Sequence, residues 1–172
     1  MRRSLIALTL LALAAAPAAL AATPSPVKKS TTYTGKTSQG DVCRHGTTDG
    51  LPCDVTLKTS KDRKRVTKLT IRWRGGPCSA NPSQYYRAAT QFVDLAISSK
   101  ARIKFAGSYE AELDGGETAT NTVKLNGKFT RTTSGKYRAS GDLTVVSDIV
   151  SPNGSKTHCE TGKVTWSAKP AK

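Results

Sequence analysis

Apolar and polar residues alternate along several stretches of this chain. Leu69, Ile71 and Trp73, for example, alternate with lysine, threonine and arginine side chains. Because successive side chains of a strand point to opposite faces of a sheet, this pattern predicts a β-strand with one apolar and one wet face. The same period recurs, with apolar residues or glycine at alternate positions, over 103–109, 123–129, 137–145 and 164–168. The chain is therefore predicted to be built mainly from β-strands.

Turn signals rich in glycine, proline and asparagine separate the predicted strands: Gly75-Gly76-Pro77, Asp114-Gly115-Gly116, Ser134-Gly135 and Pro152-Asn153-Gly154. Short strands joined by tight turns predict an all-β fold, namely an antiparallel up-and-down β-barrel or sandwich of about eight strands. Glycines also occur on the apolar faces, at Gly107, Gly127 and Gly141, which suits strands that bend sharply around a small core. On this ground we favour the barrel.

The segment 83–97 fits a helix or a strand. A helix would place Phe92 and Val93 along one apolar face. Strand periodicity fits nearly as well, except that Phe92 lies off the face shared by Val93 and Leu95. We predict a short helical turn over 83–88, followed by a strand.

The start of the chain has the parts of a secretory signal peptide. Met1-Arg2-Arg3 supplies a basic start, an apolar run follows over 5–20, and the small residues Ala19 and Ala21 suit a cleavage site after Ala21. No second apolar run is long enough to span a membrane, so we expect a secreted or periplasmic protein without a membrane span. The predicted organisation is a signal peptide, a flexible leader and a single β domain, at residues 1–21, 22–32 and 33–170 respectively.

All four cysteines, Cys43, Cys53, Cys78 and Cys159, follow the predicted cleavage site. An even number in an exported chain predicts two disulfides, for which three pairings are possible. We favour Cys43 with Cys53, which closes a short turn-rich loop, and Cys78 with Cys159, which ties the middle of the chain to its last strand. A zinc site is the alternative, because histidine lies near Cys43 and beside Cys159, but neither spacing matches a zinc signature. We therefore expect no metal and no cofactor.

The chain is strongly basic, with 27 lysines and arginines, 12 aspartates and glutamates, and a formal net charge of +15 at pH 7. Such a balance favours anionic partners. Basic residues at outward positions of the predicted strands would form an anion-binding face if those strands were neighbours. The candidates are Lys68, Arg72, Arg74, Arg102, Lys104, Lys124, Lys128 and Lys163. Such a face would hold an anionic envelope or extracellular polymer, with an affinity that falls as salt rises.

Two considerations limit this interpretation of the charge. Trp73 and Trp166 share the inward parity of their strands, so no aromatic platform for specific nucleic-acid binding is predicted. The basic positions also fit an ordinary solvated sheet face, on which lysines discourage pairing between sheet edges.

Residues with catalytic chemistry are few. Histidine occurs only at His45 and His158, which could serve as general base and acid in a small ribonuclease. No feature of the sequence brings them together, so we assign no catalytic residue and expect a protein that is not an enzyme. The acidic cluster over 110–117 lacks the spacing of a calcium loop, and we interpret its carboxylates as ion-pair partners of nearby lysines.

A further alternative is a carrier, since a small barrel can hold an apolar molecule in its interior. A filled interior would instead favour recognition at the surface. In either case we expect a monomer.

Three further motifs occur in the predicted strands. They are the opening segment Tyr33-Thr34-Gly35-Lys36-Thr37-Ser38-Gln39-Gly40, the segment Gly127-Lys128-Phe129, and the closing segment Cys159-Glu160-Thr161-Gly162-Lys163-Val164-Thr165-Trp166. Together with Ile71-Arg72-Trp73-Arg74, shortly before Cys78, they give a chain that resembles a loose group of small, uncharacterised secreted bacterial β-proteins. The resemblance spans most of the mature chain and implies a β fold and the pairing of Cys78 with Cys159. The loop from Cys43 to Cys53 is peculiar to this sequence. No activity and no functional residue follow from the resemblance.

Overall fold

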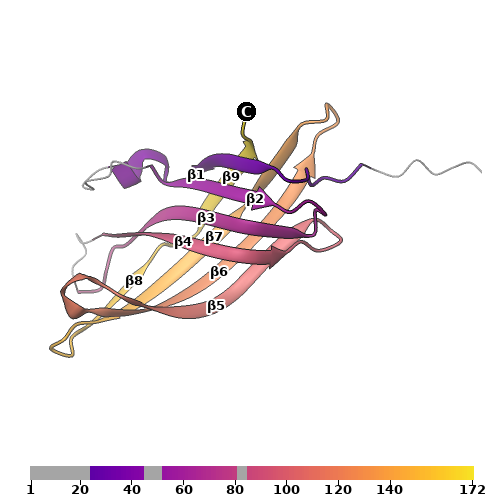
Figure 1. Ribbon diagram of the computed structural model, residues 1–172. Helices are drawn as coiled ribbons and strands as arrows, with labels where there is room; N and C mark the ends of the chain where they lie inside the picture. Colours follow the sequence, from indigo (N-terminus) through magenta and orange to yellow (C-terminus); the bar gives the residue numbers. More distant parts are fainter. Residues whose placement is uncertain (1–23, 45–51, 81–84) are drawn as a thin grey trace, which may run out of the picture.

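The computed structural model describes residues 24–44, 52–80 and 85–172 (Figure 1). Its elements are β1 (Thr32–Thr37), η1 (Gly40–Arg44), β2 (Asp54–Thr59), β3 (Arg65–Gly75), β4 (Tyr86–Ala96), β5 (Arg102–Glu112), η2 (Asp114–Gly116), β6 (Thr118–Arg131), β7 (Tyr137–Val150), β8 (Lys156–Glu160) and β9 (Val164–Pro170), where η denotes a short 3₁₀ helix. Within these ranges no helix has the length and apolar character that a membrane crossing requires. The predicted signal peptide, its cleavage site and His45 lie outside the described residues.

The strands form one antiparallel sheet of nine strands that curls into a nearly closed barrel. The order is β4-β3-β2-β1-β9-β7-β6-β5, with β8 beside β7. Pairing of β1 with β9 joins the two ends of the sequence. The path ends at β4 and β5, which do not pair with each other in the described structure and leave the barrel open between them. The predicted all-β antiparallel barrel is thus confirmed.

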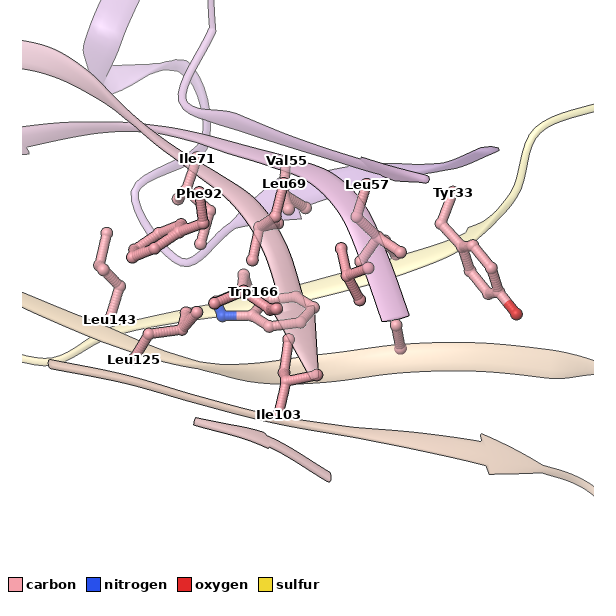
Figure 2. Packing of buried hydrophobic residues seen from close by; sticks show 14 of the residues in the cluster. Tyr33, Val55, Leu57, Leu69, Ile71, Phe92, Ile103, Leu125, Leu143 and Trp166 are labelled. Carbon is pink, nitrogen blue, oxygen red and sulfur yellow. The ribbon is translucent and has the colours of Figure 1, made fainter. Parts of the chain in front are cut away.

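The alternation in the sequence corresponds to the division between barrel interior and surface. In β3, Leu69, Ile71 and Trp73 are buried, while the residues between them reach solvent. Figure 2 shows the interior filled by aliphatic and aromatic side chains, with Trp166 among them. The Trp73 indole N–H donates a 2.8 Å hydrogen bond to the Thr90 hydroxyl, which satisfies that buried donor. Both tryptophans are core residues, as their parity predicts.

Trp166 packs where two interior glycines face each other. Gly127 of β6 lies opposite Gly141 of β7, and Gly141 also lies opposite Trp166 of β9. A Cβ atom on Gly141 would lie 2.7 Å from Trp166 Cζ2 and 2.0 Å from the Asn126 carbonyl oxygen. A Cβ atom on Gly127 would lie 2.9 Å from the same indole carbon. These glycines therefore make room for the indole within the barrel.

β4 begins at Tyr86, which corrects the predicted helical turn over 83–88 for the described residues of that range. The ladder between β3 and β4 extends to Gly75 opposite Tyr86. Backbone groups that a helical turn would pair locally are instead paired with a distant strand. Residues 83–84 lie outside the described part of the chain.

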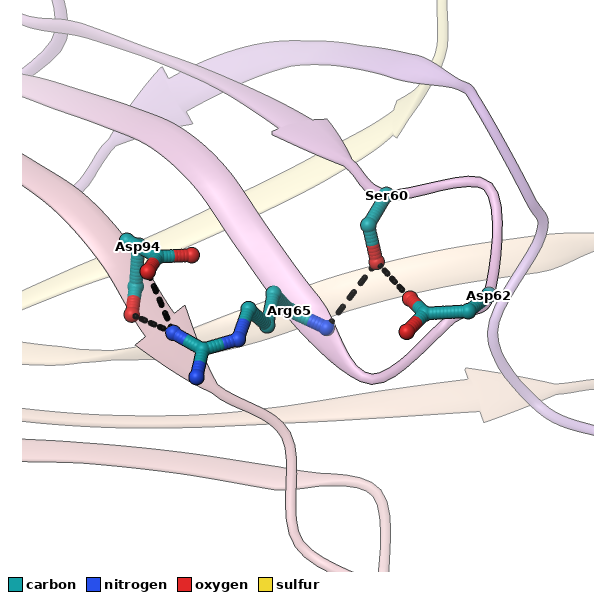
Figure 3. Close-up of polar contacts among 4 residues, drawn as sticks. All are labelled: Ser60, Asp62, Arg65 and Asp94. Atoms are coloured by element: carbon teal, nitrogen blue, oxygen red, sulfur yellow. Dashed lines mark hydrogen bonds and ion pairs between the residues drawn. The ribbon is translucent and has the colours of Figure 1, made fainter.

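A matched irregularity in β3 and β4 explains why the buried face of β4 does not follow a simple alternation. β3 contains one extra residue relative to β2, Thr67, and Asp94 lies opposite it in β4 with a φ of 60°. Phe92 is consequently buried on the same face as the residue after Asp94, whereas Val93 is 65% exposed. The Arg65 guanidinium donates to the carboxylate and the carbonyl oxygen of Asp94, which holds the irregular strands together (Figure 3).

Asp62 organises the turn between β2 and β3 (Figure 3). Its carboxylate accepts a hydrogen bond from the Ser60 hydroxyl at 2.5 Å. It accepts a second one from the Lys64 backbone N–H at 3.0 Å. Both bonds favour the charged form, so they lower the pKa of Asp62 below its ordinary value. Their contribution to the turn is present at neutral pH and is lost as the pH falls through the lowered pKa.

The leader expected to be flexible lies against the barrel over its described part, residues 24–31. Val27 is 3% exposed and belongs to the core cluster. The Lys28 backbone N–H donates to the Tyr33 hydroxyl at 3.2 Å, and the Lys28 carbonyl accepts a 2.6 Å hydrogen bond from Thr59. Burial also raises the pKa of Tyr33 above its ordinary value. One apolar side chain thus anchors a segment whose prolines and polar residues suggested no structure.

Both favoured disulfides are present, Cys43–Cys53 and Cys78–Cys159. The first connects η1 to the residue before β2, and the second connects the loop after β3 to β8. No described cysteine is free, so none of them offers the thiolate that the zinc alternative requires. Disulfides persist in oxidising compartments, which agrees with a location outside the cytoplasm.

Replacing Cys78 and Cys159 together by serine is expected to destabilise the protein more than replacing Cys43 and Cys53. The sequence separations are 81 and 10 residues. For loops of these lengths, chain entropy gives about 4.5 and about 2.7 kcal/mol respectively. Urea unfolding of the two double variants measures the difference, and equal losses of unfolding free energy would contradict it.

Gly141→Ala is expected to lower the free energy of unfolding by about 3 kcal/mol. The added methyl group meets the Asn126 carbonyl oxygen and the Trp166 indole, neither of which has room to move. Ser140→Ala, at the neighbouring outward position, is the control and should change stability by less than about 0.5 kcal/mol. If both variants unfold at the wild-type urea concentration, the glycine is not required for indole packing.

Candidate anion-binding face

The structure divides the predicted anion-binding residues between two sides of the barrel. Lys68, Arg72 and Arg74 belong to β3. The remaining candidates lie on β5, on β6 and just before β9, namely Arg102, Lys104, Lys124, Lys128 and Lys163. In the sheet order β4 and the open edge separate β3 from β5 on one side, and the β2-β1-β9-β7 strands separate β3 from β6 on the other. The predicted residues therefore do not form one stripe.

The arginines of the β3 group are already engaged. Arg72 forms a 2.7 Å ion pair with Asp54 on β2. The Arg74 guanidinium lies 3.5 Å from the centre of the Tyr85 ring, a distance that allows a cation–π contact. Lys68 is exposed and lies opposite Lys58 on β2. This side of the barrel thus presents fewer uncommitted cations than the sequence suggested.

The other side carries a row of outward residues that runs across neighbouring strands. Arg102 of β5 lies opposite Lys128 of β6, and Lys128 lies opposite Ser140 of β7. Ser140 faces Ser167 of β9, which in turn faces Lys36 of β1. Since paired strands lie roughly 4.8 Å apart, this row places two hydroxyl groups between cations along one level of the barrel wall.

Two adjacent shallow depressions occupy this wall. One, of about 430 Å³, is lined by Arg102, Lys128 and Lys163 together with polar residues of β6, β7 and β9. The other, of about 610 Å³, is lined by Lys36, Arg138 and Lys169 together with residues of β1, β2 and β9. We call this surface the basic face and define it by its exposed cations, Lys36, Arg102, Lys128, Arg138, Lys163 and Lys169.

Three cations of the basic face are not among the residues predicted from the sequence. Lys36, Arg138 and Lys169 have outward parity in their strands, so alternation could have identified them as exposed. Their proximity depends on the pairing of β1 with β9 and of β9 with β7, which the local pattern does not encode. Of the predicted residues, Lys104 and Lys124 are exposed on β5 and β6 beside the face without lining its two depressions.

The carboxylates that line the depressions have other partners. Asp54 pairs with Arg72. Asp142 accepts a 3.1 Å hydrogen bond from the Asn126 side-chain amide. Arg72 balances the charge of Asp54, whereas the neutral Asn126 amide leaves the charge of Asp142 in place. With six cations and two carboxylates around the depressions, the face keeps a net positive charge.

Cations also face one another in pairs on neighbouring strands. Arg102 lies opposite Lys128, and Lys58 lies opposite Lys68. Like charges at directly opposed positions of a sheet repel and destabilise it. An anion bound between such residues would relieve that repulsion.

The other candidate sites of the sequence gain no comparable support. Among the described residues no group of three or more histidine, cysteine, aspartate or glutamate side chains is arranged to hold a metal ion. His158 Nδ1 lies 2.7 Å from Asp148 Oδ1, and both side chains are exposed on β7 and β8. The second histidine of the ribonuclease hypothesis, His45, lies outside the described residues.

An apolar slot lies where the barrel is open. It has a volume of about 150 Å³ and is lined by residues of β4, β5 and β6, including Phe92, Phe105 and Tyr109. The rings of Phe92 and Phe105 meet edge to face across it, with 5.1 Å between their centres. The slot is therefore narrow and bounded by aromatic side chains.

A scan against protein-family models found no match, and searches of curated proteins and of solved structures found no significant similarity to this chain.

Proposed function

We propose that this chain is a secreted, non-enzymatic binding module that holds an anionic envelope or extracellular polymer on its basic face. The observation that carries the proposal is the gathering of exposed cations from β1, β5, β6, β7 and β9 around two adjoining depressions. The depressions are lined by two carboxylates, of which Asp54 is paired with Arg72, so a surplus of positive charge on the face is available to a ligand.

The physical basis of this binding is the sum of many weak contacts. A single ion pair at about 4 Å in water contributes only about 1 kcal/mol. A polymer with repeated negative charges can meet several cations of the basic face at once, and counterions released from it add to the binding free energy. Ser140 and Ser167, between the cations, can bond to hydroxyl or phosphate oxygens of the same polymer.

The carrier alternative has weaker support. Ligand pockets usually measure roughly 300 to 1,000 Å³. The apolar slot between β4 and β5 measures about 150 Å³. The interior formed by the described residues is filled by the core cluster, including Trp73 and Trp166. A filled interior favours recognition at the surface.

Added salt is expected to raise the thermal stability of the mature protein. Screening weakens the repulsion between opposed cations such as Arg102 and Lys128 more than it weakens the few ion pairs of the surface. Thermal unfolding followed by circular dichroism in a sodium chloride series measures the midpoint. A midpoint that falls as salt is added would show that ion pairs, rather than opposed cations, dominate the surface electrostatics.

Reversing charges on the basic face is expected to abolish polymer binding. In the variant Lys128→Glu, Arg138→Glu, Lys169→Glu, three cations around the serine pair become carboxylates. For binding to teichoic acid, lipopolysaccharide or RNA, the expected loss of affinity is at least about tenfold. The slope of log affinity against log salt is negative, and its magnitude should decrease by about 2 because fewer cations contact the polymer. Fluorescence anisotropy with labelled polymers measures both quantities.

The matched control is Lys61→Glu, Lys100→Glu, Lys156→Glu, which makes the same change of net charge at exposed turn and strand-end positions. A polymer whose binding is lost only in the face variant is the partner of the basic face. Equal weakening of both variants on all polymers would show that the charge acts generically and would overturn the proposed site.

A further inference from the structure

β5 has a long free edge. It spans Arg102–Glu112 and pairs only with β6 among the described strands. Its register with β6 runs without interruption and it contains no proline, so it lacks the bulges and prolines that usually protect an edge strand. Figure 1 shows β4 diverging from β5 after their shared turn. β4 cannot therefore pair with this edge along its length.

Hydrogen bonds at the ends of β5 identify which backbone groups point to the free edge. The Ala101 carbonyl accepts from the Phe129 N–H on the β6 side, and Leu113 N–H donates to the Glu117 carbonyl in the same ladder. The backbone N–H and C=O groups of successive residues in a strand point to opposite sides. Those of odd-numbered residues of β5 therefore bond to β6, and those of even-numbered residues face the free edge. The Arg102 carbonyl, which accepts from Ser98 N–H on the other side, agrees with this assignment. The backbone N–H and C=O groups of the even-numbered residues from 104 to 110 are thus directed at the free edge.

The outward side chains of β5 are ordered by charge. Arg102 and Lys104 lie at its beginning, and Glu110 and Glu112 lie at its end, with small residues between them. An antiparallel copy of this strand, centred on Gly107, would place each cation opposite a carboxylate. The charge pattern is therefore complementary to itself.

We propose that β5 pairs antiparallel with β5 of a second copy of this chain, about a two-fold axis at Gly107. Lys104 then lies opposite Glu110 of the partner subunit, and Ala106 lies opposite Ser108 of the partner subunit. Both are pairs of even-numbered residues, so their backbone groups meet across the new edge. Arg102 and Glu112 of the partner subunit flank this pairing. The interface is isologous, as a two-fold axis requires.

The same pairing covers apolar surface that the barrel leaves exposed. Phe105 and Tyr109 point toward the interior side of β5, and Phe105 contacts Phe92 of β4, yet they remain 38% and 39% exposed because β4 does not pair with β5. The symmetric register places Phe105 opposite Tyr109 of the partner subunit, a cross-strand aromatic pair of a kind that stabilises sheets. Gly107 between them carries no side chain to obstruct the axis.

β4, at the other end of the strand order, is less suited to this role. Its backbone is irregular at Asp94, where φ is 60°. An irregular edge does not present an even row of hydrogen-bonding groups to a second strand. The regular, self-complementary edge of β5 thus points to a dimer of this chain, in place of the monomer expected from the sequence.

A proline on the free edge tests the backbone pairing. Ala106→Pro removes an edge-facing N–H without removing a bond to β6, so the barrel should remain folded while the dimer dissociates. Ala106→Thr retains the N–H and is the matched control. Sedimentation velocity over a concentration series measures the mass of the mature protein, and thermal unfolding by circular dichroism checks the fold. We expect dimers of the wild type and of Ala106→Thr, and monomers of Ala106→Pro.

Exchanging the charges tests the register and does not depend on the proline variant. Lys104→Glu and Glu110→Lys each create two like-charge contacts in a symmetric dimer, and each should raise the dimer dissociation constant by about tenfold. The double variant Lys104→Glu, Glu110→Lys restores opposite charges and should return the dissociation constant to the wild-type value.

A wild-type protein that stays monomeric at millimolar concentration would overturn the proposal. So would a dimer that persists in a folded Ala106→Pro variant, or a double variant that fails to regain what the single variants lose. Failure of this proposal can be distinguished from failure of polymer binding, although Arg102 belongs to both surfaces. The substitutions that test the basic face lie on β6, β7 and β9, whereas those that test the dimer, at Lys104, Ala106 and Glu110, line neither depression.

Discussion

Pairing of β1 with β9 is the constraint on which the rest of the structure depends. It closes the barrel between the first and last strands and gives the sheet an enclosed interior. The strands approach so closely that a Cβ atom on Gly35 would lie 1.8 Å from the Ser167 carbonyl oxygen. The core residues of both halves can meet only because this long-range pairing forms. Glycine at that position is therefore a requirement of closure.

Closure also creates the candidate site, since the interior and the basic face are opposite sides of the same strands. β9 directs Trp166 onto the glycines of β6 and β7 and directs Ser167 and Lys169 outward. Packing of the Trp166 indole against these glycines consequently sets how β9 is aligned with β6 and β7. That alignment in turn places the outward residues that form the basic face. A change that loosens the Trp166 packing would disturb the alignment of cations from β1, β6 and β7.

The surface carries two features that cost stability in the isolated chain. Opposed cations repel across neighbouring strands, and an unpaired edge leaves backbone groups and aromatic rings exposed to water. We propose a different partner for each feature, a polyanion in the first case and a second copy of the chain in the second. Binding to the outside of a well-packed barrel, rather than to its interior, is the theme common to both.

The sequence by itself determined which face of each regular strand points inward, because alternation is a local property of the chain. Trp73 and Trp166 were assigned to the core on this basis, and both favoured cysteine pairs formed. The sequence did not determine that Phe105 and Tyr109 stay exposed on the inward face of β5, since that depends on the open edge of the barrel. Tertiary structure decided the rest. The irregularity at Asp94 exists only opposite β3, and Arg138 meets Lys169 only through the pairing of β7 with β9. Strand order and register arise from contacts between distant segments, so a periodic pattern within one segment cannot specify them.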